Sequence, residues 1–273
     1  TVYSSTNLST WTTVQATPAY NVGLAGGGIR LQFGACVFDG RMWVSGGRNS
    51  VTNDLLDDVY SSSDGVTWTL TANTPGWAIR SGHHMVGYAG KLWVFGSSVS
   101  GGGALRDVWS SSDGITWAQA TATATWTARY ETSVMVLNSK MWLIGGLLAA
   151  GGYTDDCYST TDGITWTLET SAPGWSTRGR VGLAVANTTA YLICGYTGIA
   201  YTTDMWSTTD GISWTLVAAD IGIASTGAAA STDNGTNYGY FPSNGAMVAS
   251  ASSLYVFGLA PGGTWDDQSY SNP

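Results

Sequence analysis

The chain has 273 residues, a formal net charge of −8 at pH 7 and only 10% charged residues. So few positive charges argue against nucleic acid or an anionic membrane as partner, and no apolar run of about 18 residues is present to insert into a bilayer. Abundant glycine (37), tryptophan (14) and tyrosine (14) indicate a β-rich chain with many turns.

An aromatic residue, a short run of Ser, Thr, Asp and Gly, and a tryptophan recur five times along the chain. The pairs are Tyr3/Trp11, Tyr60/Trp68, Trp109/Trp117, Tyr158/Trp166 and Trp206/Trp214. The repeat length of about 50 residues is that of one four-stranded propeller blade. The sequence therefore predicts an all-β fold, a five-bladed β-propeller formed as a single domain by residues 1–273.

Each repeat begins with an apolar run, which predicts the first strand of a blade. These runs are Phe33–Phe38, Met85–Tyr88, Val134–Leu137, Val181–Val185 and Ala246–Ala249. A two-residue tip and a second apolar strand follow, and a Gly-rich loop leads to an aspartate and the third strand. The Asp-Gly pair before each later tryptophan predicts a two-residue hairpin turn in which both residues have positive φ.

The two ends of the chain look like parts of one blade. Residues Thr1–Val14 resemble third and fourth strands, and Asn244–Asp267 resemble a first half. We expect the N-terminal segment to close the propeller, which removes exposed strand edges. Asp267–Tyr270 competes with Val2–Ser4 for the place of the third strand, and a spare terminal strand would allow self-assembly with another chain.

The repeated residues resemble the kelch family of β-propellers. The pattern is an arginine, an apolar strand, an apolar–aromatic–apolar strand that ends in Gly-Gly, then a tyrosine and a tryptophan. It reads here Arg30…Met42-Trp43-Val44-Ser45-Gly46-Gly47…Tyr60…Trp68 and recurs in three later repeats. Kelch propellers usually have more blades than the five that this chain supplies. The Asp-Gly sequence motif is also similar to the Asp-box of sialidases. This similarity implies that Asp64, Asp113, Asp162 and Asp210 form turns.

Four arginines lie at a constant distance before the aromatic residue of the second strand, and three tryptophans precede them by three residues. The arginines are Arg30, Arg80, Arg129 and Arg178, and the tryptophans are Trp77, Trp126 and Trp175. Blade topology places them on the face that also carries the acids Asp58, Asp107, Asp156, Asp204 and Asp267. Guanidinium groups suit carboxylates and indoles suit sugar faces, so this set predicts a ligand-binding face. Alternatively, each arginine pairs with a repeated aspartate and is structural.

Positions where the repeat breaks are further candidates for ligand binding. Arg48 and Arg180 are unrepeated and lie on or near the same predicted face. The segment Val217–Tyr240, which includes Tyr238, is a long loop before the fifth repeat, and long loops in compact domains are often functional.

Metal and catalytic chemistry have little support in the sequence. His83 and His84 are adjacent on a strand and point to opposite faces, so they cannot chelate one ion together. The acidic stretch Asn53–Asp58 could hold calcium, although it lacks a defined ligand spacing. Glycoside hydrolysis would need two facing carboxylates, and no such pair is readable. Tyr130-Glu131 resembles the Tyr–Glu pairing of sialidases, but strand neighbours diverge. We expect no metal and no cofactor.

These observations predict a secreted or cell-surface, non-enzymatic binding propeller, lectin-like or adhesive, whose ligand is a glycan or an acidic peptide. Two alternatives remain open. One is a sialidase-like or other glycan-active enzyme. The other is a structural subunit of a surface fibre or phage particle.

Overall fold

The computed structural model describes residues 2–4, 12–15, 17–21, 24–97, 99, 103–221, 230–233, 236–239, 246–249, 253–259 and 265–271. The chain divides into two compact units, residues 1–130 with 162–166, and residues 131–161 with 167–273. A single domain over residues 1–273 stays a prediction. No helix in the described ranges is long and apolar enough to cross a bilayer.

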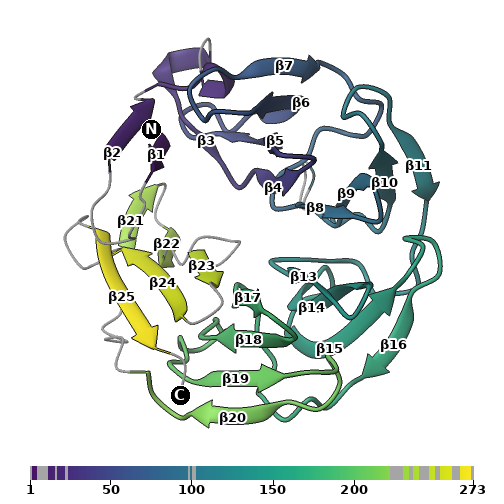
Figure 1. Ribbon diagram of the computed structural model, residues 1–273, viewed down its shortest axis with the longest axis vertical. Coiled ribbons are helices and arrows are strands. Elements are labelled where there is room, and N and C mark those ends of the chain that lie inside the picture. The colour runs from purple at the N-terminus through teal and green to yellow at the C-terminus, as the bar shows by residue number, and fades with distance from the viewer. Residues whose placement is uncertain are drawn as a thin grey trace. The chain divides into compact units, whose positions relative to one another are not determined.

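The fold is an all-β β-propeller whose blades are sheets of four antiparallel strands in sequence order (Figure 1). The first unit contains β4 (Gly34–Phe38), β5 (Arg41–Asn49), β6 (Leu55–Ser62) and β7 (Thr69–Ala72), followed by β8 (His84–Tyr88), β9 (Lys91–Phe95), β10 (Val108–Ser111) and β11 (Ala118–Thr121). The second unit contains β13 (Ser133–Leu137), β14 (Lys140–Leu148), β15 (Tyr153–Thr160) and β16 (Thr167–Thr170), followed by β17 (Gly182–Ala186), β18 (Thr189–Ile193), β19 (Met205–Thr208) and β20 (Thr215–Ala218). Two short strands that contain repeated arginines, β3 (Arg30–Leu31) and β12 (Arg129–Tyr130), and two 3-10 turns, η1 (Ala19–Asn21) and η2 (Ala25–Gly27), complete these regions.

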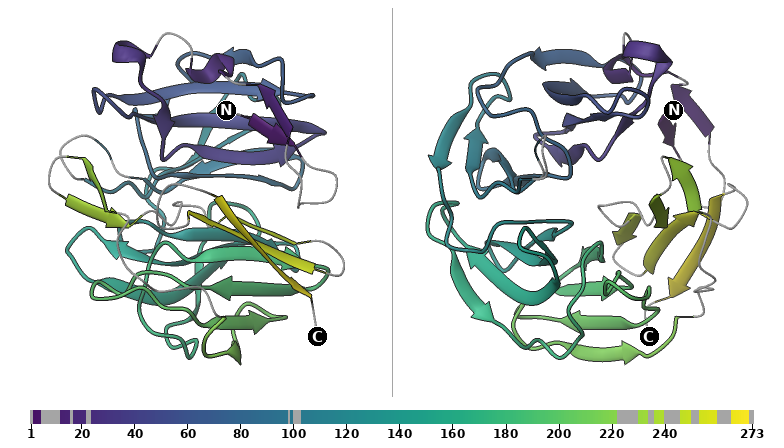
Figure 2. Two further views of the ribbon diagram at one scale, coloured as in Figure 1. Left: turned by 90° about the vertical axis from the view of Figure 1, so that its left-hand side faces the viewer. Right: turned by 180° about the vertical axis from the view of Figure 1, so that it is seen from behind.

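The described residues form four such blades, so the prediction of five is wrong. The remaining repeat comes from the two ends of the chain and forms two separate sheets. One is a hairpin of β1 (Val2–Ser4) and β2 (Thr12–Gln15). The other is a three-stranded sheet of β23 (Ala246–Ala249), β24 (Ser253–Leu259) and β25 (Trp265–Ser271). These strands appear in both views of Figure 2. This repeat also lacks the arginine that the other four share.

The strand register of the C-terminal sheet shows which segment acts as its third strand. Tyr255 of β24 pairs with Ser269 of β25, just as Trp43 of β5 pairs with Ser61 of β6. β25 therefore occupies the third-strand position, and β1 pairs with β2. The sequence left the third strand of this blade open between the two ends of the chain, and the C-terminal segment supplies it. Closure of the propeller by the N-terminal segment stays a prediction.

The tips between first and second strands have the predicted two-residue form. Asp39 and Gly40 have φ values of 48° and 65°, and Asn138 and Ser139 have φ values of 51° and 55°. Two successive positive φ values give a turn that matches the twist of the flanking strands. Asp39-Gly40 is accordingly the whole connection between β4 and β5.

The Asp-Gly turns between third and fourth strands differ from the prediction. Gly65 has a φ of 73°, but Asp64 is not among the residues with positive φ, and β6 and β7 are separated by residues 63–68. Instead of a two-residue hairpin, Asp64 Oδ1 accepts the backbone N–H groups of Val66 (2.8 Å) and Thr67 (2.7 Å). Asp113, Asp162 and Asp210 accept the equivalent pairs of hydrogen bonds. The four aspartates are turn formers, as expected.

We expect the free energy of unfolding to fall as the pH drops from about 4 to about 2. Backbone N–H donors hold the pKa of Asp64 at about 2, below its usual 3.8, and lower the pKa of Asp113. Burial raises the pKa of Asp204, but hydrogen bonds from Arg178 outweigh this and lower it. A carboxylate with a lowered folded-state pKa stabilises the fold above its unfolded pKa and loses this contribution as the pH falls through the folded value. Thermal unfolding followed by circular dichroism checks this, and a constant Tm across that window would contradict it.

Candidate functional site

Three of the repeated arginines form buried ion pairs with the aspartate in or just before the third strand of their own blade. Arg30 contacts Asp58 through Nη2–Oδ2 (2.9 Å), Arg80 contacts Asp107 through Nη1–Oδ1 (2.9 Å) and Nη2–Oδ2 (2.7 Å), and Arg178 contacts Asp204 through Nη1–Oδ1 (2.6 Å) and Nη2–Oδ2 (2.9 Å). Each pair is a two-pronged contact, the strong form of this interaction.

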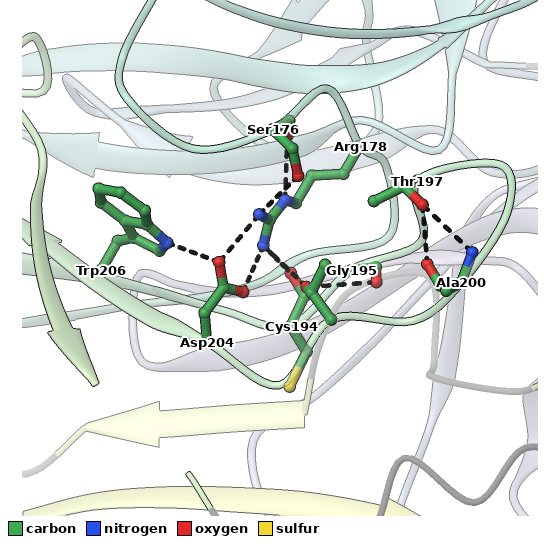
Figure 3. Close-up of polar contacts among 9 residues, drawn as sticks. Ser176, Arg178, Cys194, Gly195, Thr197, Ala200, Asp204 and Trp206 are labelled. Carbon is green, nitrogen blue, oxygen red and sulfur yellow. Dashed lines mark hydrogen bonds and ion pairs between the residues drawn. The ribbon is translucent and has the colours of Figure 1, made fainter. Parts of the chain in front are cut away.

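Arg178 shows how completely such a guanidinium is satisfied inside the second unit (Figure 3). Its Nε donates to the Ser176 carbonyl (3.0 Å), and Nη1 donates to the Cys194 carbonyl (3.1 Å) as well as to Asp204. The Asp204 carboxylate also accepts the indole N–H of Trp206 at 2.8 Å. Arg178 therefore connects the segment before β17 to the end of β18 and the start of β19.

The three tryptophans before the arginines are also interior residues. Trp77, Trp126 and Trp175 are 4%, 0% and 3% exposed. Each lies edge-on to the Asp-Gly tryptophan of its own blade; the ring pairs are Trp77–Trp117 (4.4 Å), Trp126–Trp166 (6.1 Å) and Trp175–Trp214 (6.2 Å). In the first blade Tyr20 of η1 takes this place, 4.7 Å from Trp68, which the sequence analysis did not foresee.

This arrangement matches the structural alternative for the repeated arginines and tryptophans. Arg129 is fully buried and donates through Nε to the Thr127 carbonyl, and Arg30, Arg80 and Arg178 are at most 4% exposed. A side chain that is enclosed and already paired has no surface to offer a ligand without first breaking the fold. We therefore assign these seven side chains to the scaffold.

The remaining candidates in the first unit show no assembled site. Arg48 donates to the Asn53 side chain. In the stretch Asn53–Asp58, Asp54 accepts a hydrogen bond from the Thr52 hydroxyl and Asp58 forms an ion pair with Arg30. Both carboxylates therefore already have protein partners. His83 is 1% exposed and 2.9 Å from Ser45 Oγ, and burial holds its pKa well below the usual value. Within the described ranges no group of three His, Cys, Asp or Glu residues could hold a metal.

Part of the segment Val217–Tyr240 lies outside the described residues. The part that is described contains a hairpin of β21 (Ala230–Asp233) and β22 (Thr236–Gly239), with Ser231 paired to Tyr238 through the backbone. The predicted uninterrupted loop is therefore wrong in this part. Nothing is assigned to the Tyr238 side chain, which is outside the described set.

A polar and aromatic group of side chains, which we call the tyrosine cluster, does come together in the second unit. Its members are Glu131, Tyr153, Arg180, Tyr196 and Tyr201, and all are half-buried. Glu131 precedes β13, Tyr153 begins β15, Arg180 precedes β17, and the other two tyrosines lie in the loop between β18 and β19. Of these residues, only Arg180 was a candidate from the sequence.

The tyrosine cluster is organised around one ion pair. Arg180 pairs with Glu131 through Nη2 and Oε1, and their side chains are 14% and 13% exposed. Tyr153 donates its hydroxyl to Glu131 Oε2 at 3.0 Å. The Tyr196 ring is 5.8 Å from that of Tyr153 and 4.9 Å from that of Tyr201, centroid to centroid. Carboxylate, guanidinium and three phenol rings thus share one small area.

An exposed loop tip adjoins the tyrosine cluster. Thr197 N donates to the Ala200 carbonyl at 3.0 Å. Thr197 Oγ1 contacts the same carbonyl at 3.0 Å, which closes a tight turn (Figure 3). Tyr196 donates its hydroxyl to the Gly198 carbonyl at 3.1 Å, and Ile199 at the tip is 93% exposed. The turn therefore holds an apolar side chain in solvent beside the aromatic rings.

The electrostatics of the cluster keep the phenols of Tyr153 and Tyr201 neutral and Arg180 charged. Burial, followed by the charge and hydrogen bond of Glu131, raises the pKa of Tyr153. Burial also raises the pKa of Tyr201, although the charge of Arg180 opposes it. Burial lowers the pKa of Arg180, but the hydrogen bond to Glu131 and its charge outweigh this effect and raise it. At neutral pH the cluster therefore offers hydroxyl donors and an ion pair whose charges cancel.

Glu131 and Arg180 occupy a special backbone position two residues after a repeated arginine. Gln32, Gly82, Glu131 and Arg180 have φ values of 52°, 65°, 57° and 57°. In the first unit Gly82 N donates to the Gln32 carbonyl (2.7 Å), and in the second Arg180 N donates to the Glu131 carbonyl (2.9 Å). The left-handed conformation costs a non-glycine residue about 1–2 kcal/mol, which Gly82 avoids.

Four-stranded blades with buried Arg–Asp pairs define this protein as a β-propeller. Residues 29–61 match the family model of the Kelch motif, which confirms the predicted resemblance. A solved structure described as "Structure of YjhT" is similar over 95% of this chain and 84% of that chain, with a TM-score of 0.66 and 17% identity. The likeness at that identity concerns the fold. The search of curated proteins found no match.

Proposed function

We propose that this chain is a non-enzymatic binding propeller that recognises a glycan or an acidic peptide through the tyrosine cluster and the Ile199 tip. The observation that carries the proposal is the placement of three tyrosines, an ion pair and a 93% exposed isoleucine on adjoining segments of the second unit. Binding sites commonly combine aromatic surface with a few fixed polar groups. The repeated arginines and tryptophans serve as the scaffold that positions these segments.

A glycan-active enzyme is the second candidate, because Tyr153 and Glu131 form a phenol–carboxylate pair. Nucleophilic use of the phenol would require a lowered pKa or a base that takes its proton in the reaction. Burial and Glu131 instead raise the pKa of Tyr153, which favours binding over catalysis. Release of fluorophore from 4-methylumbelliferyl glycosides, the sialoside included, would support the enzyme, provided that Tyr153→Phe abolishes it.

A secreted or cell-surface location and an adhesive role belong to the same proposal, since an adhesive glycan or peptide receptor acts outside the cell. The third candidate, a subunit of a fibre or phage particle, rested on a spare terminal strand. β1 pairs with β2 and β25 pairs with β24, so each has one edge in use. Sedimentation that shows a concentration-dependent polymer would favour this candidate.

Replacing Ile199 by aspartate is expected to weaken ligand binding at least tenfold while leaving the melting temperature within about one degree. The side chain is solvated, so a polar residue costs the fold little, whereas a buried carboxylate at an interface is unfavourable. Binding is measured on an array of neutral and sialylated glycans and on immobilised polyglutamate peptides.

The matched control for this substitution is Ile115→Asp, the same change at an Asp-Gly turn where the isoleucine is 60% exposed. This control should bind like the unmodified protein. Equal loss in both variants, or no binding of any glycan or peptide by the unmodified chain, would overturn the proposed function.

A further inference from the structure

The backbone at residues 131 and 180 does not require the side chains that it carries. The left-handed conformation and the main-chain hydrogen bond from Arg180 N to the Glu131 carbonyl use no side-chain atom. In the first unit Gly82 adopts the same conformation and donates the same bond to Gln32. Glycine is the residue that fits this conformation best. A glutamate and an arginine in this position therefore indicate that the side chains themselves are used.

The contacts of the two side chains cancel their charges. Arg180 and Glu131 are paired with each other, and the second carboxylate oxygen of Glu131 accepts from Tyr153. An anionic ligand would have to displace Glu131 from Arg180 and approach a chain with a net charge of −8. A hydroxyl group, by contrast, both donates and accepts, so neighbouring hydroxyls can bond to the carboxylate and the guanidinium without separating them.

We propose that Glu131 and Arg180 are the specificity-determining pair of the tyrosine cluster and that they select a neutral polyhydroxylated ligand, a sugar ring without a carboxylate. This inference rests on the proposed function and decides between its two ligand classes. The rings of Tyr196 and Tyr201 supply flat surface beside the pair for the apolar C–H face of the sugar. The hydroxyls of the sugar then meet Glu131 and Arg180 at one edge of that surface.

The test uses the methyl glycosides of galactose, glucose, mannose and N-acetylglucosamine as neutral probes and those of glucuronic and N-acetylneuraminic acid as acidic probes. Isothermal titration calorimetry is carried out at low and high NaCl. We expect at least one neutral probe to bind with a Kd that changes less than twofold with salt. Binding confined to acidic probes and weakened by salt would overturn the inference but leave the proposed function standing.

The deciding variant is Glu131→Gly with Arg180→Gly, which removes both charges together and suits the left-handed backbone. We expect at least a tenfold loss of affinity for the neutral probe with no fall in Tm. Gln32→Gly is the matched control, since it makes the same backbone change in the first unit and should bind normally. Unchanged affinity in the double variant, with binding still lost in Ile199→Asp, would overturn this inference alone.

A second double variant, Glu131→Gln with Arg180→Gln, keeps hydrogen-bonding groups of similar size but no charge. It should bind the neutral probe within tenfold of the unmodified chain, because amides also donate and accept. If the glycine double variant fails to fold, this glutamine double variant still tests the role of the pair. Complete loss of neutral-probe binding in this folded variant would mean that the charges of the pair are required, and would overturn the inference that the pair selects the ligand by hydrogen bonds to its hydroxyls.

Discussion

Replacing Arg80 by methionine is expected to lower the free energy of unfolding by about 3–5 kcal/mol. Arg80 is fully buried, and both of its terminal nitrogens bond to the Asp107 carboxylate. Methionine fills the volume but leaves the Asp107 charge in the interior without its partner, and such a charge is far more costly than the intact pair. Urea unfolding monitored by tryptophan fluorescence measures the change.

The double variant Arg80→Met with Asp107→Leu separates the charge effect from the packing effect. Because neither charge remains, it should recover most of the lost stability. Arg41→Met is the control at a half-buried arginine whose described partner is a neutral group, the Ser61 hydroxyl at 2.9 Å. If Arg80→Met were no more harmful than Arg41→Met, the Arg–Asp pairs would not hold the blades together.

Replacing Gly114 by alanine should destabilise the protein by about 2–6 kcal/mol, from backbone strain and overpacking together. Gly114 has a φ of 72°, and an added Cβ would lie 2.1 Å from Cζ3 of Trp43. Trp43 is 4% exposed and its indole N–H is bonded to the Phe38 carbonyl, so it has little room to move. Differential scanning calorimetry should show a Tm lower by many degrees.

Gly40→Ala isolates the strain from the overpacking. Gly40 has a similar φ of 65°, but nothing lies within 4 Å of an added Cβ. This variant should lose only about 1–2 kcal/mol, the cost of the left-handed backbone. Equal losses in Gly40→Ala and Gly114→Ala would show that the close approach to Trp43 adds nothing to the cost at Gly114.

Much of the fold follows from local signals that repeat. The spacing of Tyr60 and Trp68 and their counterparts predicted four-stranded blades, because each repeat needs the same burial and turn chemistry. The number of blades did not follow, since only strand pairing shows whether Ser269 or the N-terminal strand aligns with Tyr255. Turn type was missed because Asp64 shapes its turn by accepting two backbone N–H groups rather than by adopting positive φ.

The candidate site was harder to predict because its members come from separate segments. Tyr130 is the sequence neighbour of Glu131, but the tyrosine that bonds to Glu131 is Tyr153, from the following hairpin. The repeated arginines were predicted to form part of a ligand-binding face. Their repetition from blade to blade is, however, what a structural scaffold requires. One signal was available: Gly82 aligns with Glu131 and Arg180 two residues after an arginine and marks a position with positive φ.

The main-chain hydrogen bond between Glu131 and Arg180 has a consequence for how recognition evolves. Since the carbonyl and the N–H hold the two segments together, natural drift or a laboratory library can exchange both side chains without rebuilding the blades. A new ligand preference then requires as few as two codon changes, and a paralogue with other residues there would share the scaffold but not the ligand. Positions 131 and 180 are therefore where randomised libraries on this protein should begin.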